Sequence, residues 1–252
     1  MVTSMPGWVD PPRGEDLPYD DGEPLESLRH RHQMSLLIEC LRTAWRGRAA
    51  FVAGNMAVYF SSAQARNNDF RAPDFFVVKD VDPKERKSWV VWEEDGRAPD
   101  FVVELLSEST EAVDRGRKME IYARVLKVPE YVLFDPWTQV FEFYRQHPET
   151  HAYERVEPDA SGRVHSTELG YALGLWEGEY LEIRCPWLRF FDDGELVPTA
   201  AEAAQRQAEV ALRDAEAAQR QAEVALRDAE AAEAPAARLE ARLREHGLDP
   251  DD

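Results

Sequence analysis

The chain has 252 residues, enough to bury a sizeable core, and its 44% hydrophobic and 31% charged residues are typical of a soluble globular protein with charged appendages. No window approaches the roughly 20 apolar residues of a membrane-spanning helix, and the N-terminus lacks the features of a signal peptide, so we expect a cytoplasmic protein. The formal net charge of -19 argues against tight, metal-free binding to duplex DNA, although it is compatible with a site where divalent cations contact the phosphates.

The N-terminal part of the chain predicts an acidic arm followed by a helix. Residues 1–29 are rich in Pro, Gly, Asp and Glu and show no apolar period, which indicates a flexible arm. Apolar residues then recur at helical spacing from Gln33 to Arg46, which predicts an amphipathic helix. His30 and His32 precede this helix, and a surface or capping role is the simpler interpretation of both. The main domain is expected to cover residues 30–195.

Alternating apolar residues predict the first strands. The segment from Phe51 to Phe60 indicates a strand or a hairpin, and Trp89 to Trp92 could add a short strand. Between them, Arg71-Ala72-Pro73-Asp74 opens a strand from Phe75 to Val78, and its proline suits a strand start. Arg97-Ala98-Pro99-Asp100 repeats this pattern, so we expect another strand directly after it.

That next strand carries the most informative residue of the sequence. Phe101 to Leu106 is apolar on both faces except for one acid, which is typical of a strand covered on both sides. Residues two apart share a face, so Asp100 and Glu104 project from the same face. A carboxylate among covered apolar residues is costly unless a cation, a metal or hydrogen-bond donors compensate it. Glu104 therefore indicates either a functional site or a buried ion pair.

A helix and a further strand follow Glu104. Ser107, Ser109 and Thr110 offer caps for a helix that runs to about Leu126 and carries Lys118 one turn before Tyr122. Tyr131 to Phe134 then predicts a short buried strand. A strand-helix-strand crossover of this kind requires parallel pairing of its two strands.

The last third of the chain predicts exposed strands and a helical tail. Gln139 to Arg145 and Tyr153 to Val156 resemble a strand pair, and the aromatic segment 174–191 should cover the core. The segment AEAAQRQAEVALRD then occurs twice without change from Ala201, which predicts a long Ala-rich helix within a tail over residues 196–252. Pro235 should kink or end this helix, so that a second short helix follows it.

The heptad spacing of the tail leaves two interpretations open. Alanines recur at core-like positions of the heptads, and such a small-residue seam packs weakly. The tail could be a mostly solvated helix, or it could pair with a second copy of the chain as a coiled-coil homodimer.

Four charged residues predict chemistry when they are taken together. Asp74 lies at the mouth of one strand, Asp100 and Glu104 lie on one face of another, and Lys118 lies on the following helix. Carboxylates from neighbouring strands form an oxygen site suited to Mg²⁺ or Mn²⁺, which keeps several waters and can carry a substrate phosphate. A nearby lysine can orient or help deprotonate the attacking water and offset charge on phosphorus. Each residue also has a structural interpretation, as a turn residue, an ion-pair partner or a solvated helix residue.

These residues carry a resemblance to a known family. The order helix, three strands, helix, strand, with Pro73-Asp74 in one strand and an acid in the next, resembles the PD-(D/E)XK nuclease superfamily. The segments RAPDFVVELLSEST and MEIYARVLKVPEYVLFDP, with Asp114 and Lys118 between their motifs, more closely resemble the Uma-two family of restriction endonucleases, formerly a domain of unknown function. The resemblance covers roughly residues 30–190. It implies a restriction-endonuclease-like α/β fold, an αβββαβ core with a mixed central sheet, and Mg²⁺-dependent cleavage of DNA.

The resemblance also implies roles for particular residues. Asp74 and Glu104 would bind the metal, with Asp100 as a candidate third ligand. The superfamily places its catalytic lysine two residues after the acid, where this chain has Leu106. Lys118 could supply the amine from the following helix, or the protein could have lost cleavage. The alternative function is therefore an inactive nuclease fold that serves as an interaction module through its C-terminal helix.

Overall fold

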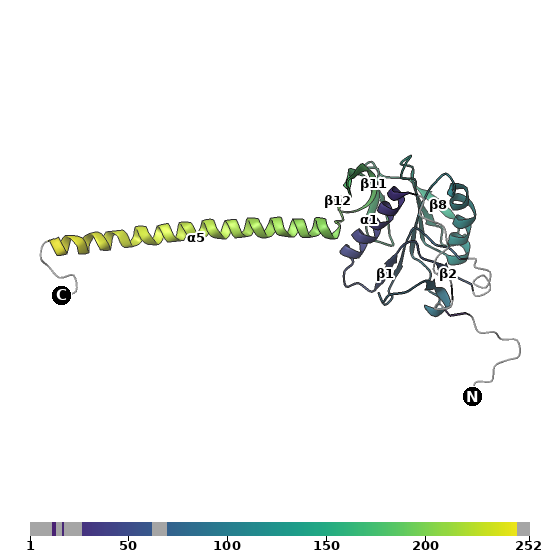
Figure 1. The fold of residues 1–252 in the computed structure, drawn as a ribbon, viewed down its shortest axis with the longest axis horizontal. Coiled ribbons are helices and arrows are strands. Elements are labelled where there is room, and N and C mark those ends of the chain that lie inside the picture. The colour runs from purple at the N-terminus through teal and green to yellow at the C-terminus, as the bar shows by residue number, and fades with distance from the viewer. Residues whose placement is uncertain (1–11, 14–16, 18–26, 62–69, 246–252) are drawn as a thin grey trace, which may run out of the picture. The chain divides into compact units, whose positions relative to one another are not determined.

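The computed structural model describes residues 12–13, 17, 27–61 and 70–245 of the chain (Figure 1). Contacts within the chain separate it into two units, Met1–Ala200 and Ala201–Asp252. The first unit contains every strand and the candidate site, and the second contains a single described helix. No described helix is both long and apolar enough to cross a membrane.

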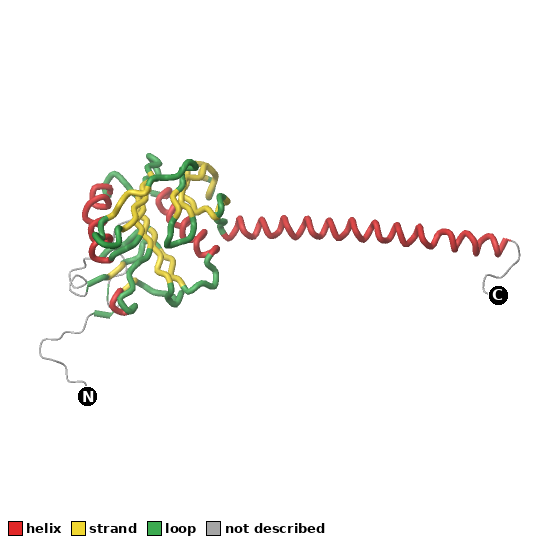
Figure 2. Tube along the Cα trace, turned by 180° about the vertical axis from the view of Figure 1, so that it is seen from behind, coloured by secondary structure: helices red, strands yellow, loops and turns green. Residues whose placement is uncertain are grey.

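A six-stranded mixed sheet organises the first unit (Figure 2). Its strands, in spatial order, are β1 (Ala50–Ala53), β3 (Phe75–Lys79), β5 (Phe101–Leu105), β6 (Glu130–Phe134), β7 (Phe141–Gln146) and β8 (Tyr153–Val156). The central pair β5 and β6 is parallel, as the strand-helix-strand pattern predicts, and the other neighbours are antiparallel. The predicted α/β fold with a mixed central sheet is therefore confirmed.

Two smaller sheets complete the described strands. The aromatic closing segment forms the hairpin of β10 (Ala172–Tyr180) and β11 (Ile183–Asp192), flanked by β9 (Val164–His165) and β12 (Glu195–Leu196). Farther toward the N-terminus, β2 (Val58–Tyr59) pairs in parallel with β4 (Trp89–Val90), and the 3-10 turn η2 (Val91–Glu93) follows β4.

A hairpin between residues 51 and 60, which the sequence pattern allowed, is absent because β1 pairs with β3 and β2 with β4. The chain turns away from the main sheet at Gly54-Asn55, where the Asn55 N–H donates to the Pro73 carbonyl at 2.9 Å. A Cβ atom on Gly54 would lie 2.1 Å from the Asp74 carbonyl oxygen, so this close approach requires glycine. The turn thereby ties β1 to the residue that opens β3.

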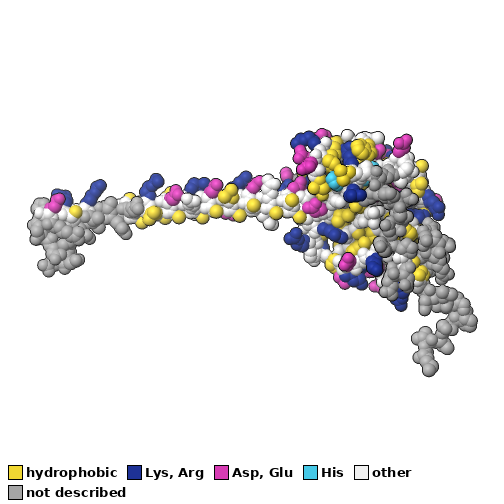
Figure 3. All heavy atoms as spheres, viewed as in Figure 1, with side chains coloured by type: hydrophobic (Ala, Val, Ile, Leu, Met, Phe, Trp, Pro, Cys, Tyr) yellow, Lys and Arg dark blue, Asp and Glu magenta, His cyan; other side chains and the backbone are white. Residues whose placement is uncertain are grey.

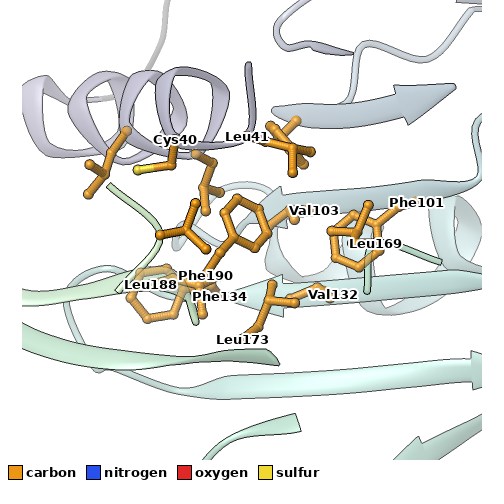
Figure 4. Packing of buried hydrophobic residues seen from close by; sticks show 14 of the residues in the cluster. Cys40, Leu41, Phe101, Val103, Val132, Phe134, Leu169, Leu173, Leu188 and Phe190 are labelled. Carbon is orange, nitrogen blue, oxygen red and sulfur yellow. The ribbon is translucent and has the colours of Figure 1, made fainter. Parts of the chain in front are cut away.

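Helix α1 (Leu28–Ala44) begins earlier than its apolar period indicates. Ser27 caps it by accepting a hydrogen bond from the His30 N–H at 3.2 Å, so the prediction that His30 and His32 precede the helix is wrong. The helix lies over one face of the sheet, where its apolar residues join a buried cluster with residues of β5, β6 and β11. Members of that cluster labelled in Figure 4 include Cys40, Leu41, Phe101, Val103, Phe134 and Phe190.

The helix between β5 and β6 covers the opposite face of the sheet. It consists of α3 (Glu111–Val113), η3 (Asp114–Lys118), α4 (Met119–Ile121) and η4 (Tyr122–Leu126), where η3 and η4 are π-helical turns. Its buried residues, Tyr122 and Leu126, join a second cluster with residues of β3, β5 and β6. π-Helical turns inside α-helices recur at functional sites.

Helix α5 (Ala200–Glu245) contains both repeats and runs through Pro235, so the prediction that the helix could end at this residue is wrong. Proline removes one hydrogen bond within the helix, to the carbonyl four residues earlier. That carbonyl belongs to Ala231, which is exposed, so water can donate a hydrogen bond to it instead. Residues 246–252, where the second helix was expected to end, lie outside the described residues.

Candidate active site

The antiparallel register of β3 and β5 brings two of the predicted acids together. Phe75 pairs with Val103 in this register, so Asp74 and Glu104 occupy the adjacent positions on the same face of the sheet. The Asp74 Oδ2 atom accepts a hydrogen bond from the Leu105 N–H at 2.7 Å, which fixes its carboxylate beside the end of β5. Glu104 is completely buried on the face covered by the helix after β5.

Two side chains of that helix reach the Glu104 carboxylate. The Tyr122 hydroxyl donates to Glu104 Oε1 at 2.8 Å, and the Lys118 ammonium lies 3.2 Å from Glu104 Oε2. The sequence pattern placed Lys118 one turn before Tyr122, and both side chains point at the same acid. The Lys118 side chain is 21% exposed, so the cluster lies close enough to the surface for a ligand to approach it.

Asp114 is a further acid of this cluster that was not predicted as a site residue. Its Oδ1 atom lies 2.6 Å from the Lys118 Nζ atom, and its side chain is 1% exposed. The Tyr131 hydroxyl donates to the Asp114 carbonyl at 3.0 Å, which anchors the π-helical turn to β6. The four-residue spacing between Asp114 and Lys118 was the available sequence signal, because residues so spaced lie on one helix face.

Two acids of the cluster, Glu104 and Asp74, bind protons more tightly than ordinary carboxyl groups do. Burial raises the pKa of Glu104 to about 8, although the Lys118 ammonium lowers it. Burial also raises the pKa of Asp74, against the hydrogen bond from Leu105. Burial alone would lower the pKa of Lys118, but the carboxylates of Glu104 and Asp114 outweigh it and raise that pKa. Lys118 therefore stays protonated at neutral pH.

Asp100 does not join these residues. It precedes β5 at the opposite end of the strand from Glu104, and four residues of strand span about 13 Å. Its Oδ2 atom accepts a hydrogen bond from the Lys79 N–H at 2.7 Å and lies 3.9 Å from the Arg97 guanidinium. These contacts tie the start of β5 to the end of β3, so we leave Asp100 out of the candidate site.

His30 lies at the border of the site, although its sequence position indicated a surface or capping residue. Its side chain is buried, with Nε2 3.0 Å from the Leu106 carbonyl and Nδ1 2.7 Å from the Ser27 hydroxyl. Leu106 itself packs in the second apolar cluster, at the position where the superfamily carries lysine. His30 thus holds the backbone just beyond Glu104 in place.

The donor atoms of the cluster suit a divalent cation that keeps several waters. Glu104 Oε2 and Asp114 Oδ1 are buried, and the Lys118 ammonium lies 3.2 Å from the first and 2.6 Å from the second. Carboxylate oxygens are the ligands that Mg²⁺ and Mn²⁺ prefer. In the part of the chain that the structure describes, no group of three or more His, Cys, Asp or Glu side chains is arranged to hold a metal. Water or substrate oxygens would therefore complete the coordination of a metal held by Asp74 and Glu104.

The raised pKa of Glu104 predicts how stability depends on pH without metal. A carboxyl group with an ordinary pKa of 4.5 and a folded-state value of about 8 contributes stability that is complete below 4.5 and lost as the pH rises toward 8. The loss is at most about 1.4 kcal/mol per pH unit. In urea unfolding between about pH 5 and 8, the wild type should therefore lose stability relative to Glu104→Gln, because glutamine does not ionise.

The control for this prediction is Glu108→Gln, the same chemical change at an exposed residue four positions later. This variant should follow the wild type over the whole pH range. If Glu104→Gln also followed the wild type, Glu104 would titrate like an ordinary surface acid, and the electrostatic description of the cluster would be wrong.

A family model and a solved structure are similar to this chain. The model of a family named Uma2 and described as "Putative restriction endonuclease" matches residues 5–184. No curated protein matches the chain. Among solved structures, the chain resembles one titled as a "putative nuclease belonging to DUF820" from Anabaena variabilis ATCC 29413. The two sequences are 18% identical, the alignment covers 60% of this chain and 82% of that one, and the TM-score is 0.43.

Proposed function

Since the chain belongs to the Uma2 family, whose model is described as "Putative restriction endonuclease", we propose that it is a cytoplasmic, metal-dependent endonuclease that hydrolyses phosphodiester bonds in DNA. One observation carries the proposal. The Nζ atom of Lys118, on the helix after β5, lies 3.2 Å from Glu104 of β5, and Asp74 occupies the neighbouring position on the adjacent strand. This supports the relocation of the superfamily lysine from the position of Leu106 to Lys118.

The acids would bind the metal, and the lysine would stabilise the transition state. Asp74 and Glu104 would hold Mg²⁺ or Mn²⁺, and the bound ion would polarise the phosphate and promote ionisation of the attacking water. Lys118 keeps its proton, because the neighbouring carboxylates raise its pKa, so it acts as a hydrogen-bond donor and a cation and does not act as a base. A preorganised donor of this kind stabilises charge that develops on the phosphoryl oxygens.

Two further residues position this machinery. The Tyr122 hydroxyl holds Glu104 Oε1, which leaves Oε2 directed toward Lys118. Asp114 holds the Lys118 ammonium from the same helix at 2.6 Å. Asp114 would keep the amine in place when a metal ion draws the Glu104 carboxylate toward itself.

The proposal is tested by incubating the full chain with supercoiled plasmid, single-stranded DNA and RNA. Parallel reactions contain Mg²⁺, Mn²⁺ or EDTA. We expect cleavage of DNA that requires either metal and stops with EDTA. Cleavage of RNA alone would overturn the DNA assignment, and intact substrates under every condition would favour the second candidate function.

That second candidate is an inactive nuclease fold that binds partners through α5. The observation that favours it is a set of exposed apolar residues on α5 that recurs with the sequence repeat. These residues are Val210 and Leu212 and their repeat equivalents, Val224 and Leu226. Val210 and Val224 lie on one side of the helix and Leu212 and Leu226 lie on the other, so each side presents a repeated apolar residue that a partner would cover.

For either function we propose that α5 mediates weak self-association. Two identical two-heptad repeats offer equivalent registers to a second copy, which favours a dimer that a small-residue seam holds loosely. Light scattering measures the molar mass of the particle, and this mass divided by the mass of one chain should be larger for the full protein than for a version that ends at Pro198. The same number of chains per particle in the two proteins would show that α5 does not mediate self-association.

A further inference from the structure

A pocket of about 820 Å³ lies at the end of the sheet opposite the acid cluster. Its lining comes from the end of α1, the turn that follows, β1 and residues 83–86. In the register of the main sheet, Ala50 at the start of β1 pairs with Lys79 at the end of β3. Asp74 precedes the other end of β3, about 17 Å away along the strand. The pocket is therefore separate from the site proposed above.

Basic side chains dominate the lining of this pocket. Five cations face one acid, Glu85, and these cations are Arg42, Arg46, Arg48, Lys84 and Arg86. Figure 3 shows basic side chains gathered where Figure 1 draws the end of α1 and β1. The whole chain has a net charge of -19, so an excess of Lys and Arg in its composition does not explain this cluster of basic residues. Like charges held around one cavity repel one another until an anion enters.

Part of this basic lining is held rigidly, and part of it is available to a ligand. The Arg42 guanidinium donates twice to the Val52 carbonyl, at 3.0 and 2.7 Å, and Arg86 forms a bidentate pair with Glu94. By contrast, Arg46 and Lys84 are exposed and form no ion pair with any residue that the structure describes. The fixed arginines shape the pocket, and the other cations remain to bind an anion.

The inner wall of the pocket is apolar. Trp45 is only 6% exposed, and its indole Nε1–H is buried without a hydrogen-bond partner. Phe51 and Met56 line the same pocket, and the Arg48 guanidinium lies over the Trp45 ring at 5.2 Å.

We propose that this pocket binds a phosphate-bearing small molecule of nucleotide size. Arginine forks bind phosphate oxygens through paired, charge-assisted hydrogen bonds, which suits the phosphates to Arg46 and Arg48. The aromatic wall around Trp45 and Phe51 suits a flat heterocycle. The volume also falls in the range of roughly 300–1,000 Å³ that is typical of small-molecule sites.

The test measures equilibrium binding to the full chain by calorimetry, at low salt and with EDTA present. EDTA prevents metal-mediated binding of phosphates at Asp74 and Glu104. The probes are a nucleoside triphosphate, inorganic pyrophosphate, the unphosphorylated nucleoside and a twelve-nucleotide single strand. We expect saturable binding of the triphosphate, weaker binding of pyrophosphate and none of the nucleoside, because the arginines recognise phosphate.

Variants assign the binding to the pocket. Arg46→Ala and Arg48→Ala should each weaken triphosphate binding roughly tenfold or more, as expected for the loss of charge-assisted hydrogen bonds. Arg124→Ala, an exposed arginine on the helix after β5, and Glu104→Gln should leave the affinity unchanged. The Glu104→Gln result separates this inference from the nuclease proposal, because the basic pocket should bind the triphosphate whether or not the protein cleaves DNA.

Three outcomes would overturn the inference. One is the absence of saturable triphosphate binding, and another is equal weakening by Arg124→Ala and Arg46→Ala. The third is binding of the single strand through Arg46 and Arg48 without binding of the triphosphate. That last result would assign the pocket to a nucleic-acid backbone, the other source of the same phosphate chemistry.

Discussion

Glu104→Gln is expected to lower metal-dependent cleavage of DNA on the order of a thousandfold or more, because one metal ligand and its charge are lost. Glutamine keeps the volume of the side chain, and its carbonyl oxygen can still accept the Tyr122 hydrogen bond. The fold should therefore survive, and at neutral pH the variant should be at least as stable as the wild type. Initial rates on plasmid DNA at saturating Mg²⁺ measure the effect.

Matched variants make this result specific to the site. Asp74→Asn should cause a loss of similar size, since Asp74 lies beside Glu104 on the adjacent strand. Glu108→Gln, on the exposed surface shortly after β5, should cleave at the wild-type rate. If Glu104→Gln cleaved within about tenfold of the wild type, Glu104 would be a structural acid, and the nuclease site would have to lie elsewhere.

Lys118→Met should lower the cleavage rate by on the order of a hundredfold or more while the protein still binds metal, in line with the loss of one transition-state donor. Methionine retains most of the length of the lysine stem and removes the ammonium. Asp114 and Glu104 then lose their cation, and their remaining charge can attract Mg²⁺. Rates measured over a range of Mg²⁺ concentrations separate the catalytic effect from the effect on binding.

Lys118→Arg and Arg124→Met sharpen the test of Lys118. Arginine keeps the positive charge and cannot lose its proton, so partial activity in Lys118→Arg would agree with a charged donor and not with a base. Arg124→Met removes a cation from an exposed position on the same helix and should leave the rate unchanged. A Lys118→Met protein as active as the wild type would show that the ammonium only neutralises buried acids.

The arrangement of the main strands was predictable because local patterns and packing agree there. The apolar run around Glu104 and the crossover to the following strand required a parallel, covered pair, which β5 and β6 form. The separation of β1 from β2 was not predictable, because it depends on the close approach of Gly54 to the Asp74 carbonyl. Alternating residues alone do not say which strand a segment will join.

The positions of the candidate residues were predictable where secondary structure sets side-chain direction. Glu104 and the helix that carries Lys118 follow from the period of a strand and from a crossover that must cover it. Asp114 was missed because its burial depends on the π-helical turn that begins at this residue, which has no clear sequence signature. Asp100 was included because it shares a face with Glu104, yet a common face does not bring residues at opposite ends of a strand together.

The basic pocket had no comparable signal in the sequence. Its cations come from two segments, residues 42–48 and 84–86, and each segment alone is typical of a solvated surface. Only the pairing of β1 with β3 places the end of α1 near the loop after β3. Sites built from distant loops therefore depend on the folded chain.

Calorimetric titration of Mn²⁺ into the wild type and Glu104→Gln at about pH 8.5 tests the central claim most directly. The claim is that Asp74 and Glu104 form a metal site, and it predicts saturable binding to the wild type that Glu104→Gln abolishes or weakens at least about a hundredfold. At about pH 6.5 the wild type should bind more weakly, because burial raises the pKa of Glu104 to about 8 and the metal must displace its proton. Equal Mn²⁺ affinity for the two proteins at both pH values would contradict the account.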